Sequence, residues 1–273
     1  MVLCLKTWKS RSLPGFSFFI FNCVDLLVSY LVSMFGFSIV IPIYNESKNI
    51  NVLVEEIFYS LREYSNFELI LVNDGSSDDT ADVLQRTKKS FSIKIITNKI
   101  KFGQSFAILN GVKNSKYNTI VTLDGDGQNN PKDISKLLEI YFSKKVLSLV
   151  GGIRKNRKDN LVKIISSKIA NNVRSLILND NCIDTGCSLK VFDKNVFLKF
   201  PYFDGIHRFL PALFKGFGKE TFFIEVDHRP RISGISKYGI LDRLFKGTID
   251  IIRVVNIIKK NKQNISEKLN ECK

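Results

Sequence analysis

From Phe37 onward, apolar residues fall into short strand-like runs that alternate with segments of helical period. The runs are rich in β-branched and aliphatic residues, as is typical of buried strands; they lie at 38–43, 67–72, 93–97 and 119–123. The segments with an apolar residue every three or four positions lie at 48–64, 79–89 and 104–114. This alternation predicts an α/β fold with a mostly parallel central sheet and flanking helices.

Polar motifs follow three of these strands, at the edge where an open α/β sheet binds its ligands. The first is Pro-Ile-Tyr-Asn-Glu at 42–46, and the second is Asn-Asp-Gly-Ser-Ser-Asp at 73–78. The Asp74 carboxylate could accept a hydrogen bond from a nucleobase or a ribose hydroxyl, or it could serve only the turn. Asp78 and Asp79 have the simpler role of capping the next helix.

The third motif, Asp-Gly-Asp-Gly-Gln-Asn at 124–129, follows the fourth strand. Asp124, Asp126 and Gln128 offer hard oxygen ligands. Mg²⁺ and Mn²⁺ prefer such ligands, and Mg²⁺ completes its shell with water and substrate phosphates. The alternative is an Asp-Gly turn that binds no metal.

Two basic segments beyond Val150, at 154–179 and 240–258, place Lys and Arg beside aliphatic residues at helical spacing. They predict amphipathic helices. Such helices can lie in the headgroup layer of an anionic membrane. The alternative is that they are ordinary surface helices of a basic protein.

A basic loop at 228–238 contains Arg229, Arg231, Ser236 and Lys237. Arginine binds phosphate through two donors and lysine as a point charge, so the loop is a candidate phosphate clamp. The alternative is a solvated basic loop. The remaining polar motif is Asp-Thr-Gly-Cys-Ser at 184–188.

Charge is the unusual feature of the composition. The 273 residues include 41 Lys and Arg against 26 Asp and Glu, a formal net charge of +15. An anionic partner is therefore expected: a nucleic acid, an anionic membrane or a phosphorylated substrate. Most of the 22 phenylalanines lie in apolar runs, which argues against nucleic acid because few remain to stack on bases.

Several classes of site are excluded or disfavoured. No P-loop or GxGxxG sequence follows the first strand, which argues against P-loop NTPases and Rossmann oxidoreductases. The five cysteines form no CxxC, and His207 and His228 are the only histidines. A zinc site or disulfide framework is thus not expected, both histidines are assigned structural roles, and a reducing compartment is indicated.

The chain is predicted to have three parts: an apolar leader at 1–36, a catalytic domain at 37–239, and an amphipathic helix with a tail at 240–273. Three interpretations of the leader stay open. It could lie upstream of a true start at Met34, form a membrane-associating or spanning helix, or pack on the domain. Asp25 and Asn22 interrupt its apolar stretch, and a central aspartate is costly in a bilayer.

Taken together and in this order, the motifs resemble those of the family 2 glycosyltransferases of GT-A fold. The resemblance extends over about 37–260 and is nearest to the dolichyl- and polyprenyl-phosphate sugar transferases. Besides the motifs above, it rests on Lys-Phe-Gly-Gln-Ser at 101–105 and Arg-Ile-Ser-Gly-Ile-Ser-Lys-Tyr at 231–238.

The resemblance implies a role for each candidate residue. The nucleotide sugar would contact Pro42, Tyr44, Glu46, Asp74, Gln104 and Asp124. The divalent metal, Mg²⁺ or Mn²⁺, would be held by Asp126 and Gln128. The acceptor phosphate or the diphosphate would contact Arg154, Ser167, Arg229, Arg231, Ser236 and Lys237. The family pattern has an arginine four residues before Ser167, where this chain has Lys163, and lysine lacks the bidentate geometry.

The implied reaction is transfer of a sugar, with inversion, from a GDP-mannose or UDP-hexose type of donor to polyprenyl phosphate. It would take place at the cytoplasmic face of a membrane, with the protein bound peripherally or through an N-terminal anchor. A phosphate acceptor is already anionic, so Asp184 would orient the acceptor or the sugar. With a hydroxyl acceptor, Asp184 would be the leading candidate for the base. Asp124, Asp126, Asp184 and Arg231 are the candidate catalytic residues.

The resemblance leaves two other functions open: a family 2 enzyme with a carbohydrate acceptor in polysaccharide or cell-envelope synthesis, and a non-catalytic regulatory subunit on the same fold. The presence of Asp124 and Asp126 argues against the second. The sugar, the nucleotide and the oligomeric state stay open.

Overall fold

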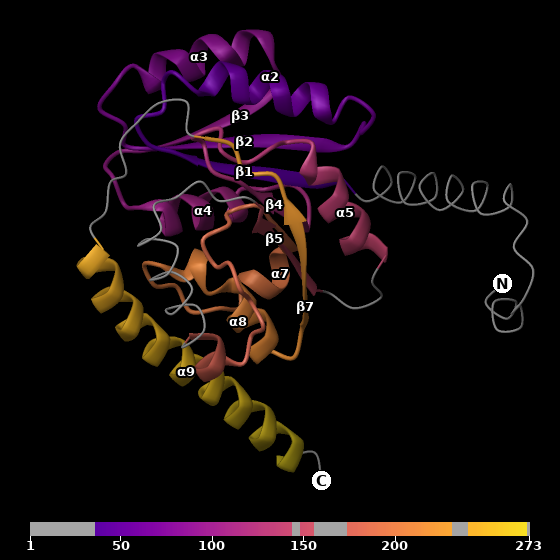
Figure 1. The fold of residues 1–273 in the computed structure, drawn as a ribbon, viewed down its shortest axis with the longest axis vertical. Helices are drawn as coiled ribbons and strands as arrows, with labels where there is room; N and C mark the ends of the chain where they lie inside the picture. Colours follow the sequence, from indigo (N-terminus) through magenta and orange to yellow (C-terminus); the bar gives the residue numbers. More distant parts are fainter. Residues whose placement is uncertain (1–35, 144–147, 156–173, 231–239, 272–273) are drawn as a thin grey trace, which may run out of the picture.

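The computed structural model of the protein describes residues 36–143, 148–155, 174–230 and 240–271. Within them, seven strands form one sheet in the order β3-β2-β1-β4-β6-β5-β7 (Figure 1). The strands are β1 Phe37–Ile43, β2 Phe67–Asp74, β3 Ile93–Asn98, β4 Thr119–Thr122, β5 Ser148–Arg154, β6 Lys190–Asp193 and β7 Glu220–Val226. β6 runs antiparallel to both of its neighbours, and the other pairings are parallel.

Helices cover both faces of this sheet. They are α2 Ile50–Ser60, α3 Thr80–Ser90, α4 Gln104–Lys113, α5 Asp133–Ser143, α7 Lys194–Phe197, α8 Leu210–Gly216 and α9 Ile240–Glu271, with a 3₁₀ turn η1 at Ile206–Arg208. The predicted α/β fold with a mostly parallel sheet is therefore confirmed. The apolar pattern did not predict strands β5, β6 and β7 or helices α5, α7 and α8.

Alternation along β1 separates two cores. Phe37, Ile39, Ile41 and Ile43 point to the face covered by α2, α3 and α5, whereas Val40 points to the opposite face. That second face is covered by α4, α7, η1, α8 and α9. Successive side chains of a strand point to opposite faces, so a strand that is apolar at nearly every position must be covered on both sides. The central strands thus form a rigid base for the polar residues at their ends.

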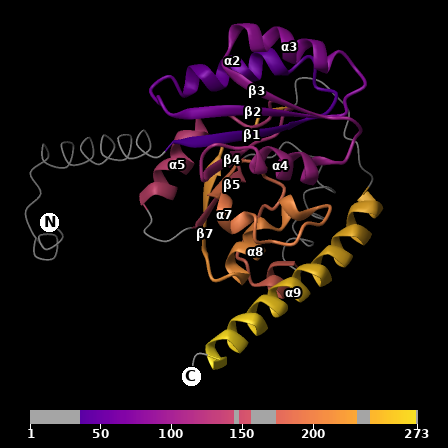
Figure 2. The same cartoon turned by 180° about the vertical axis from the view of Figure 1, so that it is seen from behind.

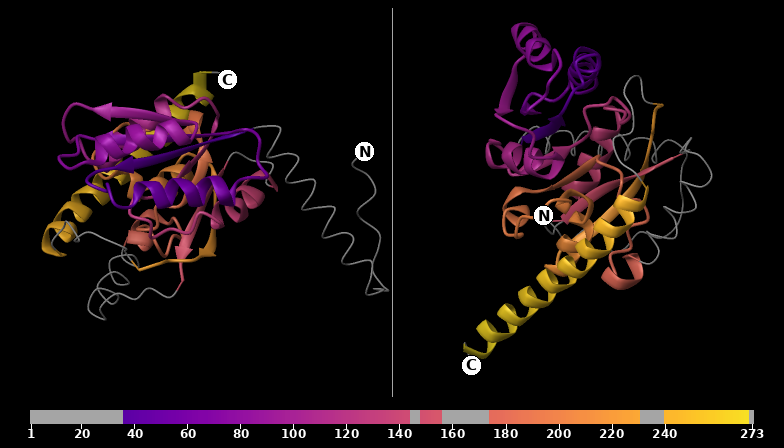
Figure 3. Two further views of the ribbon diagram at one scale, coloured as in Figure 1. Left: turned by 90° about the horizontal axis from the view of Figure 1, so that it is seen from above. Right: turned by 90° about the vertical axis from the view of Figure 1, so that its left-hand side faces the viewer.

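Helix α9 packs through its middle and extends beyond the rest of the molecule (Figures 2 and 3). Val254 is fully buried, and a Cβ on Gly216 of α8 would lie 2.4 Å from a side-chain carbon of Ile258. The Asp250 carboxylate accepts a hydrogen bond from Arg208 of η1 at 3.1 Å. The helix predicted at 240–258 therefore exists and continues to Glu271.

The other predicted amphipathic helix, at 154–179, is wrong at its start, because Arg154 is the last residue of β5. Arg174 is buried and forms an ion pair with Asp180, so it does not belong to a charged face toward lipid. An arginine counted as a surface charge can be buried when a local carboxylate and carbonyl satisfy it. Residues 156–173 lie outside the described part of the chain.

Further predictions also fall outside the described residues: the leader except Gly36, together with Ser167, Arg231, Ser236 and Lys237. The division at 37–239 and 240–273 stays a prediction. Within the described ranges, no helix is both long enough and apolar enough to cross a membrane.

Candidate active site

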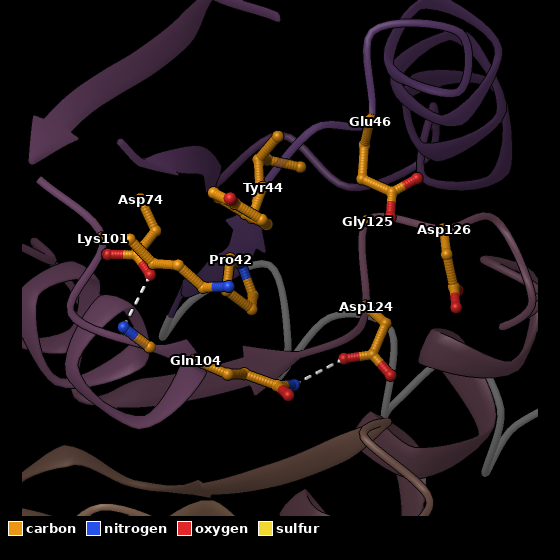
Figure 4. A pocket seen from close by; sticks show the side chains of 11 residues that line it. Pro42, Tyr44, Glu46, Asp74, Lys101, Gln104, Asp124, Gly125 and Asp126 are labelled. Carbon is orange, nitrogen blue, oxygen red and sulfur yellow. Dashed lines mark hydrogen bonds between the residues drawn. The ribbon is translucent and has the colours of Figure 1, made fainter. Parts of the chain in front are cut away.

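A pocket opens where β1, β2 and β4 end (Figure 4). It is lined by Pro42, Ile43, Tyr44, Glu46, Asp74, Lys101, Gly103, Gln104, Asp124, Gly125 and Asp126. Parallel strands bring their carboxyl ends to one edge of the sheet, so motifs distant in sequence meet there. All six residues expected at the nucleotide sugar lie in this pocket, together with Asp126.

Asp74 organises one end of the pocket. Its Oδ1 accepts hydrogen bonds from the side chain of Asn98 at 2.9 Å and the backbone N–H of Phe102 at 3.0 Å. Its Oδ2 accepts from the N–H of Gly103 at 2.7 Å, as Figure 4 shows. The carboxylate therefore fixes the loop that leads into α4, a role that neither the expected nucleotide contact nor the turn-only alternative included.

Tyr44 and Lys101 lie next to each other beside Asp74. The Lys101 ammonium lies 4.0 Å from the centre of the Tyr44 ring, a distance at which cation and ring attract. Glu46 lies nearer the other end of the pocket, where its carboxylate accepts from the Asn49 amide at 2.6 Å. An aromatic ring, a cation and carboxylates thus line one continuous pocket.

Asp124 lies between the two ends. Its Oδ1 accepts from the Gln104 amide at 2.7 Å (Figure 4), so the two residues are in direct contact. Burial, and then the nearby charge of Asp126, raise the pKa of Asp124 to about 6. Both effects penalise the ionised carboxylate, so this part of the pocket favours an incoming cation.

Asp126 and Gln128 were predicted to hold a divalent metal. Asp126 is buried, and its Oδ1 accepts from the Gln128 N–H at 3.1 Å. The Gln128 amide nitrogen donates to the carbonyl of Arg229 at 3.2 Å, which leaves its oxygen as the acceptor on the other side of the amide. One carboxylate and one amide oxygen fit a Mg²⁺ or Mn²⁺ that takes its other ligands from substrate and water. The described residues contain no cluster of three or more His, Cys, Asp or Glu that could enclose a metal.

Arg154 and Asp184 form an ion pair beside this pocket. The Asp184 carboxylate accepts from Arg154 Nε at 2.8 Å and from Nη2 at 2.7 Å. Among the influences on the pKa of Asp124, the Arg154 charge acts to lower it, so the guanidinium acts electrostatically on the pocket. The structure thus brings together a predicted acceptor ligand and a predicted catalytic residue.

Arg229 does not leave its guanidinium open to the pocket. It forms two hydrogen bonds with the Glu56 carboxylate of α2, at 2.7 and 2.9 Å, and one with Asn130 at 3.0 Å. The basic loop as a whole was the predicted clamp, but this arginine ties the loop to α2. A salt-bridged arginine near a surface was not distinguishable from a phosphate ligand in the sequence.

Both histidines have structural contacts. His207 Nδ1 lies 2.7 Å from the hydroxyl of Ser105 on α4, and burial lowers the pKa of His207 to about 3. His228 lies beside Gln128, with 3.5 Å between the imidazole Nε2 and the amide nitrogen. His207 is therefore neutral at physiological pH and joins η1 to the beginning of α4.

Sequence reasoning missed two residues of the site. Lys101 lines the pocket, although it was quoted only as part of the Lys-Phe-Gly-Gln-Ser motif. Asn129 accepts from the Asp124 N–H at 3.3 Å and from the Ser188 hydroxyl at 2.7 Å. Lys101 is a single basic residue after a strand and belongs to no sequence pattern that would mark it. The hydrogen bond between Asn129 and Ser188 joins residues 59 positions apart, so no local sequence feature indicates it.

Comparison with known proteins supports the interpretation of these motifs. The family model described as glycosyl transferase family 2 matches residues 38–201. The chain is 35% identical over 224 residues to dodecaprenyl-phosphate galacturonate synthase from Rhizobium johnstonii, covering 80% of this chain and 66% of that protein. It is 32% identical over 208 residues to undecaprenyl-phosphate 4-deoxy-4-formamido-L-arabinose transferase from Pectobacterium carotovorum, covering 75% and 63%. The chain thus spans slightly less than two thirds of these relatives.

Solved structures share the fold. Glucosyl-3-phosphoglycerate synthase from Mycobacterium tuberculosis, crystallised with Mn²⁺, UDP and phosphoglyceric acid, gives a TM-score of 0.64 at 14% identity, with 91% of this chain and 84% of that chain covered. Mannosyl-3-phosphoglycerate synthase from Rubrobacter xylanophilus gives 0.63 at 14% identity, with 87% and 78% covered. These matches confirm the predicted GT-A type of fold.

Proposed function

Because the chain belongs to glycosyl transferase family 2, we propose that it transfers a sugar from a nucleotide sugar to a polyprenyl phosphate, with inversion at the anomeric carbon. The observation that carries the proposal is the pocket at the ends of β1, β2 and β4, with Arg154 beside it. The relatives named above bear names that state a prenyl-phosphate acceptor.

The donor would lie along the pocket with its nucleoside toward Asp74 and its diphosphate toward Asp126. Tyr44 supplies an aromatic face and Lys101 a cation at the nucleoside end, and Asp74 holds the loop that closes this end. Gln104 fixes the Asp124 carboxylate, which then accepts from a ribose or sugar hydroxyl. The donor is of the GDP-mannose or UDP-hexose type.

Asp126 and the Gln128 oxygen would hold Mg²⁺ or Mn²⁺ at the diphosphate end. When bound, the ion neutralises charge that builds up on the departing diphosphate. The raised pKa of Asp124 reflects an excess of carboxylate in a buried place, and such an excess is what a cation relieves. The chain's own contribution is to present these oxygens from a rigid strand end.

The acceptor phosphate would approach Arg154, and arginine is well matched to phosphate oxygens. A phosphate monoester carries a charge of about −1.5 to −2 at neutral pH, so it is a nucleophile that needs no general base. Catalysis then consists of aligning two anionic groups and neutralising their repulsion.

Helix α9 would lie on the membrane that carries this lipid. Ile249 and Ile252 are 44% and 63% exposed, and Lys259 and Lys260 are exposed on the same side of the helix. Apolar side chains flanked by lysines match the boundary between acyl chains and anionic headgroups. We therefore place the protein peripherally on the cytoplasmic face, where an N-terminal anchor could add to the binding.

The direct test is to incubate the purified full chain with undecaprenyl phosphate, Mg²⁺ or Mn²⁺ and a panel of radiolabelled GDP- and UDP-sugars. We expect one donor to give a labelled, solvent-extractable lipid whose formation stops when EDTA is added. Undecaprenol, which has the same chain without phosphate, is the matched control and should give no product. Absence of labelled lipid with every donor, or label transferred only to added carbohydrate acceptors, would contradict the proposal.

A further inference from the structure

The Asp184 carboxylate binds Arg154 through both of its oxygens. It accepts three hydrogen bonds from Arg154: the backbone N–H at 3.1 Å, Nε at 2.8 Å and Nη2 at 2.7 Å. The Asp184 side chain is 7% exposed and that of Arg154 is 15% exposed. Both carboxylate oxygens therefore take part in a bidentate pair that is largely shielded from water.

This arrangement is unsuited to a general base. Protonating Asp184 would remove the charge that two guanidinium donors stabilise, in a place where an unpaired charge is costly. The pair also fixes Arg154 at two points, because the same carboxylate holds its backbone at the end of β5 and its side-chain head. A flexible arginine thereby loses most of its freedom before any substrate arrives.

Gly186 leaves space for the ion pair between Arg154 and Asp184. A Cβ at this position would lie 2.6 Å from Arg154 Nη2, so a larger residue would displace the guanidinium. The Asp-Thr-Gly-Cys motif thus has a physical reason for its first and third residues: the aspartate binds the arginine, and the glycine leaves space for it.

The motif that holds this arginine ends beside the pocket. The hydroxyl of Ser188 donates to Asn129 at 2.7 Å, and the same Asn129 oxygen accepts from the N–H of the pocket residue Asp124 at 3.3 Å. Nε and Nη2 form the edge of the guanidinium that binds Asp184, so Nη1 lies on the side away from this carboxylate. A preorganised guanidinium beside a pocket carboxylate is placed to receive an anionic group.

We infer that Asp184 is a positioning residue that holds the Arg154 guanidinium toward the acceptor phosphate, and that it is not the base of the reaction. The inference rests on the proposed function, because it assumes that the acceptor is a phosphate. It assigns the Asp-Thr-Gly-Cys motif to acceptor binding through Arg154.

Steady-state kinetics with farnesyl phosphate, a short soluble acceptor, test this role. Asp184→Asn keeps the size of the side chain but removes the charge and one acceptor oxygen. We expect the KM for farnesyl phosphate to rise about tenfold, as for other coupled polar pairs, with the donor KM within twofold of wild type. Arg154→Ala should raise the acceptor KM at least as much, and the double variant should be no worse than Arg154→Ala alone.

A base would give a different pattern. Loss of a general base lowers kcat by about 10²–10⁴-fold, leaves the acceptor KM unchanged and removes the acidic limb of the pH profile of kcat. Either that pattern in Asp184→Asn, or additive effects in the double variant, would overturn the inference. Asp180→Asn is the matched control, because Asp180 pairs with a different buried arginine, Arg174; its acceptor KM should stay near wild type.

A second variant covers the case in which Asp184→Asn does not fold, as judged by its thermal melt. Arg154→Lys leaves Asp184 in place and keeps the positive charge but loses the planar fork. It should still raise the acceptor KM, and an unchanged value would overturn the inference. If wild-type protein transfers no sugar to farnesyl or undecaprenyl phosphate, the proposed function itself fails, and this inference falls with it.

Discussion

On the β1–β4 side, the pocket carboxylates Asp74 and Asp124 are held by neutral donors, whereas on the β5–β7 side two carboxylates of the connection between β5 and β6 are held by arginines. Asp74 accepts from two backbone N–H groups and an asparagine amide, and Asp124 accepts from a glutamine amide. By contrast, Asp184 pairs with Arg154, and Asp180 pairs with Arg174.

The difference bears on what each side can bind. Neutral donors orient a carboxylate without cancelling its charge, so the β1–β4 side stays negative and attracts cations or hydroxyl donors. Arginine pairs balance the charge on the other side and keep guanidinium groups in place for an anion. A reaction between a metal-bound diphosphate and a lipid phosphate needs both kinds of surface next to each other.

The largest loss of activity is expected from Asp126→Asn, on the negatively charged β1–β4 side. It keeps the shape of the side chain but removes the charge proposed to bind the metal, and we expect transfer to fall by about 10²–10³-fold, as on losing one electrostatic contact to a transition state. The measurement is kcat as a function of Mg²⁺ concentration. Asp79→Asn is the matched control, because Asp79 is exposed and, contrary to the predicted capping role, makes no side-chain capping bond at α3. Unchanged metal-dependent turnover in Asp126→Asn would show that the metal assignment is wrong.

A smaller effect is expected from Asp74→Asn, which tests the role of the backbone donors. The new amide presents N–H groups where Asp74 now accepts from Phe102 or Gly103. Leaving one such buried donor unsatisfied costs about 1–3 kcal/mol, measurable by urea unfolding. Titration calorimetry with UDP and GDP should also show weaker nucleotide binding. Asp82→Asn, on the exposed face of α3, should change neither quantity; normal stability and affinity in Asp74→Asn would contradict the assigned role.

The effect that is smallest at neutral pH concerns the contact between the two sides, where His207 of η1 meets Ser105 of α4. Burial, followed by the charges of Arg208 and Lys190, lowers the pKa of His207 to about 3, from 6.5 in an exposed histidine. The unfolded chain therefore binds a proton between these values that the folded chain does not. This histidine's contribution to stability is complete above pH 6.5 and is lost as the pH falls toward 3.

His207→Gln should reduce the pH dependence of the free energy of unfolding between pH 6 and 4. The expected reduction is up to about 1.4 kcal/mol per pH unit, the slope for one proton. Urea unfolding at a series of pH values measures it. Above pH 7 the curves of wild type and variant should run parallel, which is the internal control. Identical slopes below pH 6 would show that His207 takes up its proton in the folded protein.

The same two sides explain what the sequence could predict. Strands β1 to β4 were predicted to within two residues at each end, because each is a buried apolar run between polar turns. Strand β6 was not predicted, because two of its four residues, Lys190 and Asp193, are charged. They are buried through local contacts, Lys190 with the carbonyl of Cys187 and Asp193 with the N–H of Val196. An apolar pattern carries no information about such compensation.

The candidate site residues show the same contrast between local pattern and tertiary packing. The pocket residues on the β1–β4 side were predictable because each follows its own strand, and parallel topology gathers strand ends. The pairing of Arg154 with Asp184 spans 30 residues, and that of Arg229 with Glu56 spans 173. Which carboxylate meets which arginine depends on tertiary packing, so the sequence showed the charges without their partners.

The reversed direction of β6 has a consequence for how this fold can change. Antiparallel neighbours such as β5 and β6 need a connection of only two residues, yet here residues 155–189 join them. Topology therefore does not require most of this connection, and evolution can rewrite it without altering the order of the strands. The segment contains Asp184 but none of the residues that line the pocket at the ends of β1, β2 and β4. Under the proposed function, this connection can be exchanged to suit a new acceptor while the pocket proposed for the donor stays intact.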